Sequence, residues 1–192
     1  MRLAVAALVG CLLAACGGGA RQTEPLHEAS GDDRILIASV ELRGVSEPER
    51  PAVTAIAGTH LVVDEVLTEA RYDSAHKAIL DHYYERGHVN VQVTWPETLE
   101  HAKGKTPIVV TIDEGPLFTV TKLDIKDVPD ADRARYIALS TLRPGDTFVR
   151  SQLGAWLQAV AEAAPRRPIV VPETTVDLQA NTISITLALK NP

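Results

Sequence analysis

The stretch SAHKAILDHYYERGHVNVQVTW, residues 74–95, decides the fold because its hydrophobic spacing changes at one glycine. Before Gly87, apolar residues recur at helical intervals, namely Ala75, Ile79, Leu80, Tyr83 and Tyr84. This spacing predicts a helix that Asp73 caps and that Gly87 ends with a positive φ. After the glycine, apolar residues alternate with polar ones, which predicts a strand containing Val89, Val91, Val93 and Trp95. Residues 74–95 are therefore a helix followed at once by a strand.

The sequence on either side extends this unit. An alternating strand runs from Leu36 to Gly44, where the glycine ends it. Residues 45–71 predict at least one helix, opened near two prolines and interrupted by Gly58. After the central strand, a loop over residues 96–106 leads to a third strand marked by Ile108, Val110 and Ile112. The resulting order is strand, helical region, helix, strand, strand.

The same order returns in the second half of the chain. Residues 123–125 predict a strand, 130–142 a helical region, and 169–178 and 183–189 two more strands, with an apolar helix stripe at Leu153, Trp156, Leu157, Val160 and Ala161. Residues 40–45 correspond to 123–128, and Tyr72 corresponds to Phe148. Two copies of one module account for this repeat. The fold class predicted is α+β, with two β-α-α-β-β modules, each a three-stranded mixed sheet packed on two helices.

The N-terminus carries an export signal. An uncharged run follows Arg2 and is too short to span a bilayer, which needs about 20 apolar residues. It ends in Leu-Ala-Ala-Cys-Gly at residues 13–17, which resembles the lipobox of bacterial lipoproteins. The resemblance implies cleavage after residue 15, lipidation of Cys16 and a stable membrane anchor. The alternative is an ordinary secretory peptide that has a cysteine by chance.

Residues 16–33 are rich in Gly, Ala, Glu and Asp, which predicts a flexible tether. No cysteine follows Cys16, so the mature chain has no internal disulfide and relies on apolar packing. Without the signal peptide, 18 basic residues stand against 25 acidic ones, a net charge of −7. Such a charge argues against nucleic acid as a partner.

The chain resembles the polypeptide-transport-associated (POTRA) domain family, whose members stand in tandem in the periplasm, commonly ahead of an outer-membrane barrel. The likeness rests on the order of the elements, on two glycines that end elements, Gly44 and Gly87, and on the junction between the two copies, Glu114, Gly115 and Pro116. His88 stands where the family usually has an aromatic residue. The domains expected are 34–115 and, with a less regular pattern, 116–190.

The resemblance implies that a partner strand pairs with an exposed edge strand, a mode in which backbone hydrogen bonds give the affinity. This directs attention to residues 89–95, which contain no charge and no proline, whereas the corresponding strand of the second copy contains Pro172 and Glu173. The candidate binding residues are therefore Val89, Val91, Val93 and Trp95. The alternative, left open by the sequence, is that the loop 96–106 covers this strand.

No catalytic or metal site is expected. His76, His82 and His88 are spaced six residues apart, which matches no ligand motif. No nucleophile motif or phosphate loop is visible, so we expect neither an enzyme nor a cofactor. An enzyme using His82 with Asp81 or Glu85 is a minor alternative.

The function implied is a membrane-anchored periplasmic scaffold or chaperone-like protein. Its expected partners are an outer-membrane barrel, an assembly or secretion component, or an unfolded client, and its expected location is the outer membrane. The alternative is a structural interaction lipoprotein of the envelope or division apparatus.

Overall fold

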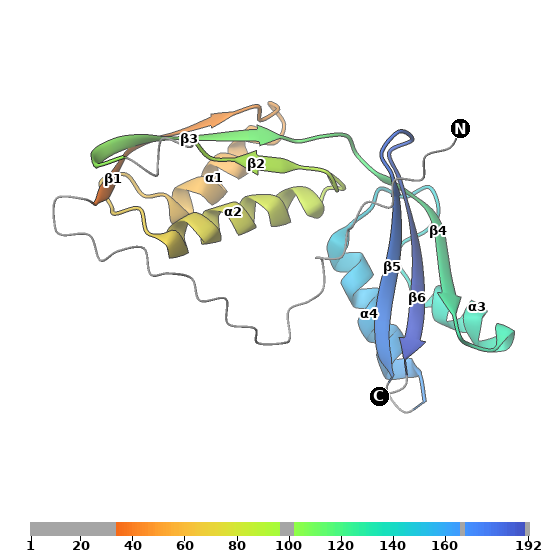
Figure 1. Ribbon diagram of the computed structural model, residues 1–192. Coiled ribbons are helices and arrows are strands. Elements are labelled where there is room, and N and C mark those ends of the chain that lie inside the picture. The colour runs from red at the N-terminus through yellow and green to blue at the C-terminus, as the bar shows by residue number, and fades with distance from the viewer. Residues whose placement is uncertain (1–33, 97–101, 166–167, 191–192) are drawn as a thin grey trace, which may run out of the picture. The chain divides into compact units, whose positions relative to one another are not determined.

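The computed structural model describes residues 34–96, 102–165 and 168–190 (Figure 1). The first module consists of β1 (Ile35–Arg43), α1 (Arg50–His60), α2 (Glu69–Tyr84), β2 (Gln92–Thr94) and β3 (Gly104–Asp113). The second consists of β4 (Thr119–Lys126), α3 (Asp130–Ala138), α4 (Arg150–Ala163), β5 (Ile169–Asp177) and β6 (Thr182–Lys190). The predicted α+β class and the repeated β-α-α-β-β order are confirmed. The predicted signal peptide, Cys16 and the tether lie outside the described residues.

Each module has a mixed sheet with its last strand in the centre. The strand order is β1-β3-β2 in the first sheet and β4-β6-β5 in the second. The central strand pairs in parallel with the first strand and antiparallel with the middle one. The two helices supply the crossover that a parallel pair requires. The middle strands β2 and β5 therefore lie at sheet edges.

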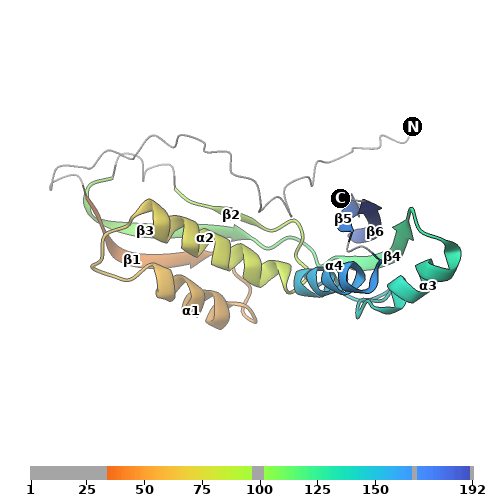
Figure 2. The ribbon, with the colours of Figure 1, turned by 90° about the horizontal axis from the view of Figure 1, so that it is seen from below.

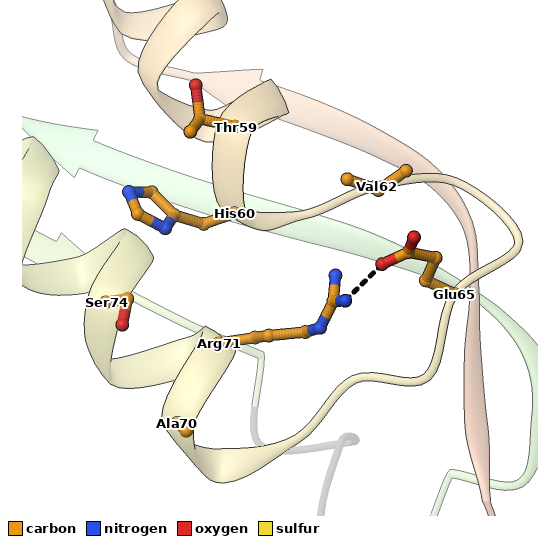
Figure 3. A pocket seen from close by; sticks show the side chains of 7 residues that line it. All are labelled: Thr59, His60, Val62, Glu65, Ala70, Arg71 and Ser74. Atoms are coloured by element: carbon orange, nitrogen blue, oxygen red, sulfur yellow. Dashed lines mark ion pairs between the residues drawn. The ribbon is translucent and has the colours of Figure 1, made fainter.

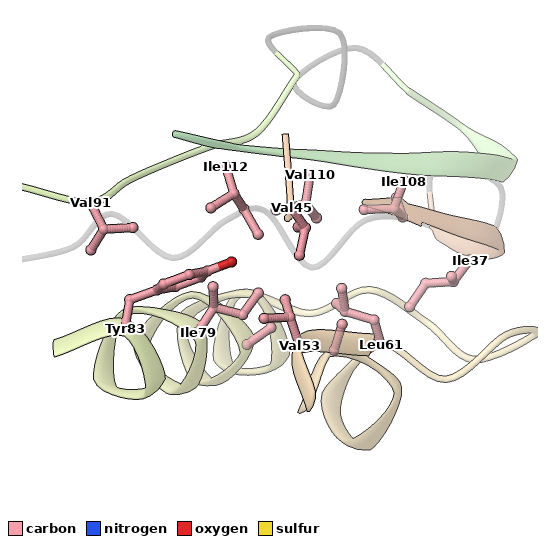
Figure 4. Close-up of a cluster of buried hydrophobic side chains, with 12 residues drawn as sticks. Ile37, Val45, Val53, Leu61, Ile79, Tyr83, Val91, Ile108, Val110 and Ile112 are labelled. Carbon is pink, nitrogen blue, oxygen red and sulfur yellow. The ribbon is translucent and has the colours of Figure 1, made fainter. Parts of the chain in front are cut away.

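In the first module, both helices cover one face of the sheet (Figure 2). Figure 4 shows the apolar side chains that fill the space between the strands and these helices. Its members are Ile37, Val45, Val53, Ala57, Leu61, Ala75, Ile79, Tyr83, Val91, Ile108, Val110 and Ile112, none more than 7% exposed. With no disulfide expected, burial of these side chains is the main stabilising contribution.

Contacts divide the described chain into two compact units. Residues 34–118 group with 147–151, and residues 119–146 group with 152–190. The second unit has its own core, in which Trp156 is 1% exposed and donates from Nε1 to the Tyr136 carbonyl at 2.8 Å. Ile125, Ile185 and Leu187 are fully buried in that core.

Two sequence predictions about helix starts are wrong. Asp73 lies inside α2, which begins four residues earlier, because Thr68 is its N-cap and accepts from the Arg71 N–H at 3.3 Å. Phe148 precedes α4 by two residues, so its counterpart before α2 is Leu67 and not Tyr72. The other alignment is supported, because Gly44 and Asp127 end their strands with φ of 76° and 65°.

Candidate functional site

The end of β3 is tied to both helices by one carboxylate. Glu114 Oε1 accepts from the Tyr83 hydroxyl at 2.8 Å and from the Ser46 N–H at 2.9 Å. Tyr83 lies in the last turn of α2, and Ser46 lies before α1. Glu114 therefore connects the last strand of the first module to the start of one helix and the end of the other.

Electrostatics explain why a glutamate is stable here. Burial alone would raise the pKa of Glu114, but the hydrogen bonds from Ser46 and Tyr83 outweigh it and hold the pKa below its ordinary value. Burial, together with the Glu114 carboxylate, raises the pKa of Tyr83, so its hydroxyl stays protonated and donates. The predicted motif residue Glu114 thus has a structural role.

The glycines of the motif allow close approach and tight turns. Gly44 has φ of 76°, and a Cβ there would lie 2.0 Å from the Ile112 carbonyl oxygen. Gly87 has φ of 92° just after α2, and Gly115 has φ of 61°. Pro116 follows as an exposed residue. At position 44, only glycine fits without moving the central strand β3.

His88 explains how the motif tolerates a missing aromatic residue. Its ring meets Tyr83 edge to face, with centroids 5.4 Å apart. Its Nδ1 lies 3.1 Å from the Gly115 carbonyl, so Nδ1 carries the hydrogen and donates. The histidine thus makes the ring contact and also holds the glycine turn.

The outer edge of β1 is occupied. Ile37 donates from its N–H to the Glu65 carbonyl at 3.0 Å and accepts from the Asp64 N–H at 2.8 Å. At the other end, the Arg50 guanidinium donates to the Leu42 carbonyl at 3.4 Å and the Val45 carbonyl at 2.8 Å. A partner strand therefore has few free groups to pair with on this side.

The second module repeats this arrangement at β4. The Val120 N–H donates to the Asp146 carbonyl, and the Gly145 N–H donates to the Val120 carbonyl, both at 2.8 Å. Arg133 Nε donates to the Ile125 carbonyl at 3.0 Å, as Arg50 does in the first module. In both sheets the first-strand edge is covered, whereas no described residue pairs with the outer edge of β2 or β5. Part of the loop that could cover β2, residues 97–101, lies outside the described residues.

β2 lies at an edge as expected, but it is shorter than residues 89–95. Val89 and Asn90 form a turn, in which Val89 donates to the Gly87 carbonyl at 3.1 Å, because the chain must reverse after α2. Val91 lies in the core at 7% exposure. Val93 and Trp95 are half-buried against this core, so these two side chains are only partly accessible to a partner. Only the backbone of Gln92–Thr94 offers a strand edge.

The edge of the second module is longer. All nine residues of β5 pair with β6, with Pro172 opposite Leu187 and Glu173 opposite Thr186. Lys126 of β4 forms an ion pair with Glu173 at 2.5 Å, across the outer face of the sheet. Ile169, at the start of this strand, is 58% exposed.

An aromatic cluster that the sequence did not reveal lies beside β2. Trp95 donates from Nε1 to His76 Nδ1 at 3.0 Å. The rings of Trp95 and Tyr72 have centroids 4.4 Å apart, and the Tyr72 and His76 rings are stacked. The three residues join α2 to the chain directly after β2. A signal existed in the four-residue spacing of Tyr72 and His76, but nothing in the sequence placed Trp95 against them.

His82 belongs to a separate polar group. Its Nε2 lies 2.7 Å from a Glu49 carboxylate oxygen, and Arg86 bonds both to its Nδ1 at 3.1 Å and to Glu49 at 3.0 Å. Since arginine only donates, His82 Nδ1 accepts and Nε2 carries the hydrogen. The His82 side chain is only 8% exposed, so this polar group is largely buried at the imidazole. Within the described residues, no group of three or more His, Cys, Asp or Glu side chains could hold a metal ion.

Two shallow hollows lie on the described surface. The first, about 440 Å³, lies between the end of α1 and the start of α2, where an Arg71–Glu65 ion pair crosses it (Figure 3). His60 and Ser74 face it from the two helices. The second, about 470 Å³, is a mainly apolar groove at α3 and β4 that includes Leu123, Ile137 and Leu142. Neither combines a nucleophile with a bonded base in the described side chains.

No helix in the described ranges is long and apolar enough to cross a membrane.

Comparison with known proteins identifies the fold. No protein-family model matches the chain, and no curated protein matches its sequence. POTRA domains 3–5 of BamA from Haemophilus influenzae superpose with a TM-score of 0.61 at 20% identity, over 83% of this chain and 67% of that one. BamA from Haemophilus ducreyi lacking POTRA domains 1–3 gives 0.59 at 12% identity, over 84% of this chain but 29% of the other.

POTRA domains 1–2 of the periplasmic domain of Omp85 from Anabaena give a TM-score of 0.52 at 12% identity, over 84% of this chain and 99% of that one. At these identities the likeness is one of fold. The chain has the fold of tandem POTRA domains, as its sequence motifs predicted.

Proposed function

We propose that this chain is a periplasmic scaffold that binds a partner or client polypeptide in outer-membrane protein assembly or secretion and is held to the membrane by lipid on Cys16. The observation that carries the proposal is the pair of POTRA-type modules, a fold found in the periplasmic domain of Omp85. The lipobox-like residues 13–17 support the anchor.

The binding element is the edge strand of the first module, Gln92–Thr94. Its neighbour on the inner side is β3, and the opposite edge of the same sheet is occupied by Asp64, Glu65 and Arg50. Val93 packs inward, so the backbone supplies most of what a partner meets. Binding through backbone groups makes little demand on sequence, which suits a protein with varied clients.

Site-specific photo-crosslinking in intact cells tests the function. A photoreactive residue at Gln92, exposed on β2, should capture an outer-membrane barrel protein or an assembly or secretion component. The matched control is Glu41, which is exposed on the occupied strand β1 and should capture neither. Division or wall components at Gln92 would support the alternative structural role, and equal capture at both positions would refute the edge.

Proline variants test the edge itself. Proline at Val91 is uninformative because that side chain is in the core. Proline at Val93 and at Thr94, each combined with the photoreactive residue at Gln92, separates the two sides of the strand, because proline keeps the sheet only where the lost N–H faces away from β3. The variants that retain the wild-type melting temperature should lose the crosslinked partner; retention of the partner would contradict binding by strand addition.

A further inference from the structure

The Tyr72–His76–Trp95 cluster stands at the end of the open edge. Trp95 is the residue directly after β2, so a strand paired with Gln92–Thr94 passes next to it. All three side chains are half-buried, and the Trp95–His76 hydrogen bond fixes the indole. His76 Nδ1 accepts this bond, so it carries no hydrogen and the imidazole adds no positive charge.

Two carboxylates flank the cluster. Glu69 and Asp73 lie three residues before Tyr72 and His76 respectively, which places them beside those rings on the surface of α2. Both are exposed, and neither forms an ion pair with any residue that the structure describes. By contrast, Arg71 pairs with Glu65, and Lys77 pairs with Asp81 at 2.5 Å.

The field of the Asp73 carboxylate reaches the Tyr72 ring. Burial and the Asp73 carboxylate together raise the pKa of Tyr72. Aromatic faces carry negative charge density, and a lysine or arginine over a Trp or Tyr face is attracted to it. The cluster therefore brings together the Trp95 and Tyr72 rings and two carboxylates that pair with no described residue, and each of these groups attracts a cation.

We propose that this cluster is a subsite for a lysine or arginine side chain of the partner strand that adds to β2. The inference rests on the proposed function and adds to it a side-chain requirement: the client strand carries a basic residue near the end that lies beside Trp95. The acidic balance of the chain, 25 acidic against 19 basic residues, favours the same class of partner.

The expected discrimination is modest and measurable. A cation over exposed aromatic rings contributes about 0.5–1 kcal/mol, and an exposed ion pair about 0.2–1 kcal/mol. Their sum, about 0.7–2 kcal/mol, corresponds to roughly a threefold to thirtyfold tighter Kd for a basic residue than for glutamine. A glutamate at that position should bind most weakly, and raising the salt concentration should reduce the differences.

The test uses capped nine-residue peptides of alternating Thr and Val, in which one guest residue, Lys, Gln or Glu, is moved position by position. Binding is followed by NMR through the indole N–H resonance of Trp95. Trp156, 1% exposed in the second module, is the internal control. At one register the Lys peptide should bind roughly threefold to thirtyfold more tightly than the Gln peptide, with shifts at Trp95 and none at Trp156.

The variant Glu69→Gln with Asp73→Asn should reduce the Lys preference to the part that the rings contribute, roughly twofold to fivefold. Asp130→Asn with Asp132→Asn in the second module changes the net charge equally and should preserve the preference. Equal binding of Lys, Gln and Glu peptides, or a Lys preference that Glu69→Gln with Asp73→Asn leaves undiminished, would overturn the subsite but leave the edge intact. Failure of every peptide to shift Trp95 would overturn both the subsite and the edge.

Discussion

Removal of the Tyr83 hydroxyl should destabilise the first module alone. In Tyr83→Phe, Glu114 Oε1 keeps only the Ser46 N–H as a donor, because the 2.8 Å bond from the hydroxyl is lost. A hydrogen bond to a charged group contributes about 1.5–3 kcal/mol, so we expect a loss of that size in the free energy of unfolding. Tyr84→Phe is the matched control, since its hydroxyl has no hydrogen bond within the described residues, and should cost under about 0.5 kcal/mol.

Hydrogen exchange measured by mass spectrometry separates the two modules. Amides of β3 report on the first core and amides of β6 on the second, because the slowest amides exchange through global opening of their own unit. Tyr83→Phe should lower protection in β3 and leave β6 unchanged. A double-mutant cycle of Tyr83→Phe with Glu114→Ala should give a coupling of about 1.5–3 kcal/mol.

The pH dependence of this effect has a definite sign. The pKa of Glu114 is lowered in the folded protein, so its contribution is complete above the ordinary pKa of 4.5 and is lost as the pH falls through the folded value. The cost of Tyr83→Phe should therefore be largest near pH 7 and shrink towards pH 3. Unchanged β3 protection at pH 7, or an equal cost at both pH values, would refute the role assigned to Glu114.

Three further predictions follow from single positions. Ile79→Ala should destabilise the first module by about 2–5 kcal/mol in urea unfolding, because the side chain is fully buried; no effect would contradict the core described here. Gly44→Ala should be destabilising by more than about 1 kcal/mol because its Cβ would meet the Ile112 carbonyl oxygen, whereas Gly58→Ala, in the exposed surface of α1, should stabilise by about 0.5–1 kcal/mol; equal melting temperatures would exclude this contrast. Cys16→Ala should move the protein from the membrane to the soluble fraction, and continued sedimentation with membranes would argue against the lipid anchor.

Local patterns predicted the elements well because helix and strand periods depend on neighbouring residues. The helix stripe at Ala75, Ile79 and Tyr83 is the buried face of α2. The position of Gly87 after a helix predicts a positive φ, which it has, and Gly44, which is predicted only to end a strand, has one as well. The N-cap was missed because Asp73 and Thr68 are both acceptable capping residues, and only the helical geometry of residues 69–72 selects the threonine.

The length of β2 could not be predicted from alternation alone. Residues 89–95 alternate almost ideally, yet Val89 and Asn90 are used to turn the chain and only three residues reach the ladder with β3. The aromatic cluster was also hidden, because it joins Trp95 to side chains 19 and 23 residues earlier. Likewise, nothing local indicates that Arg50 and Arg133 occupy the outer edges of β1 and β4.

The sequence predicts binding at β2 because β5 contains Pro172 and Glu173. The lengths of the two strands point the other way. Alternate residues of an edge strand point their backbone groups outward, so nine-residue β5 offers more of them than three-residue β2, and one proline removes at most one N–H. The number of outward-facing backbone N–H and C=O groups alone thus favours partner binding at β5. Preference for the first module must come from side chains, and the cluster around Trp95 is the feature beside β2 that can supply it.

A photoreactive residue at Thr175, exposed on β5, distinguishes the two edges. Stronger capture of basic clients at Gln92 than at Thr175 supports selection by side chains, and the reverse order would assign binding to the longer edge.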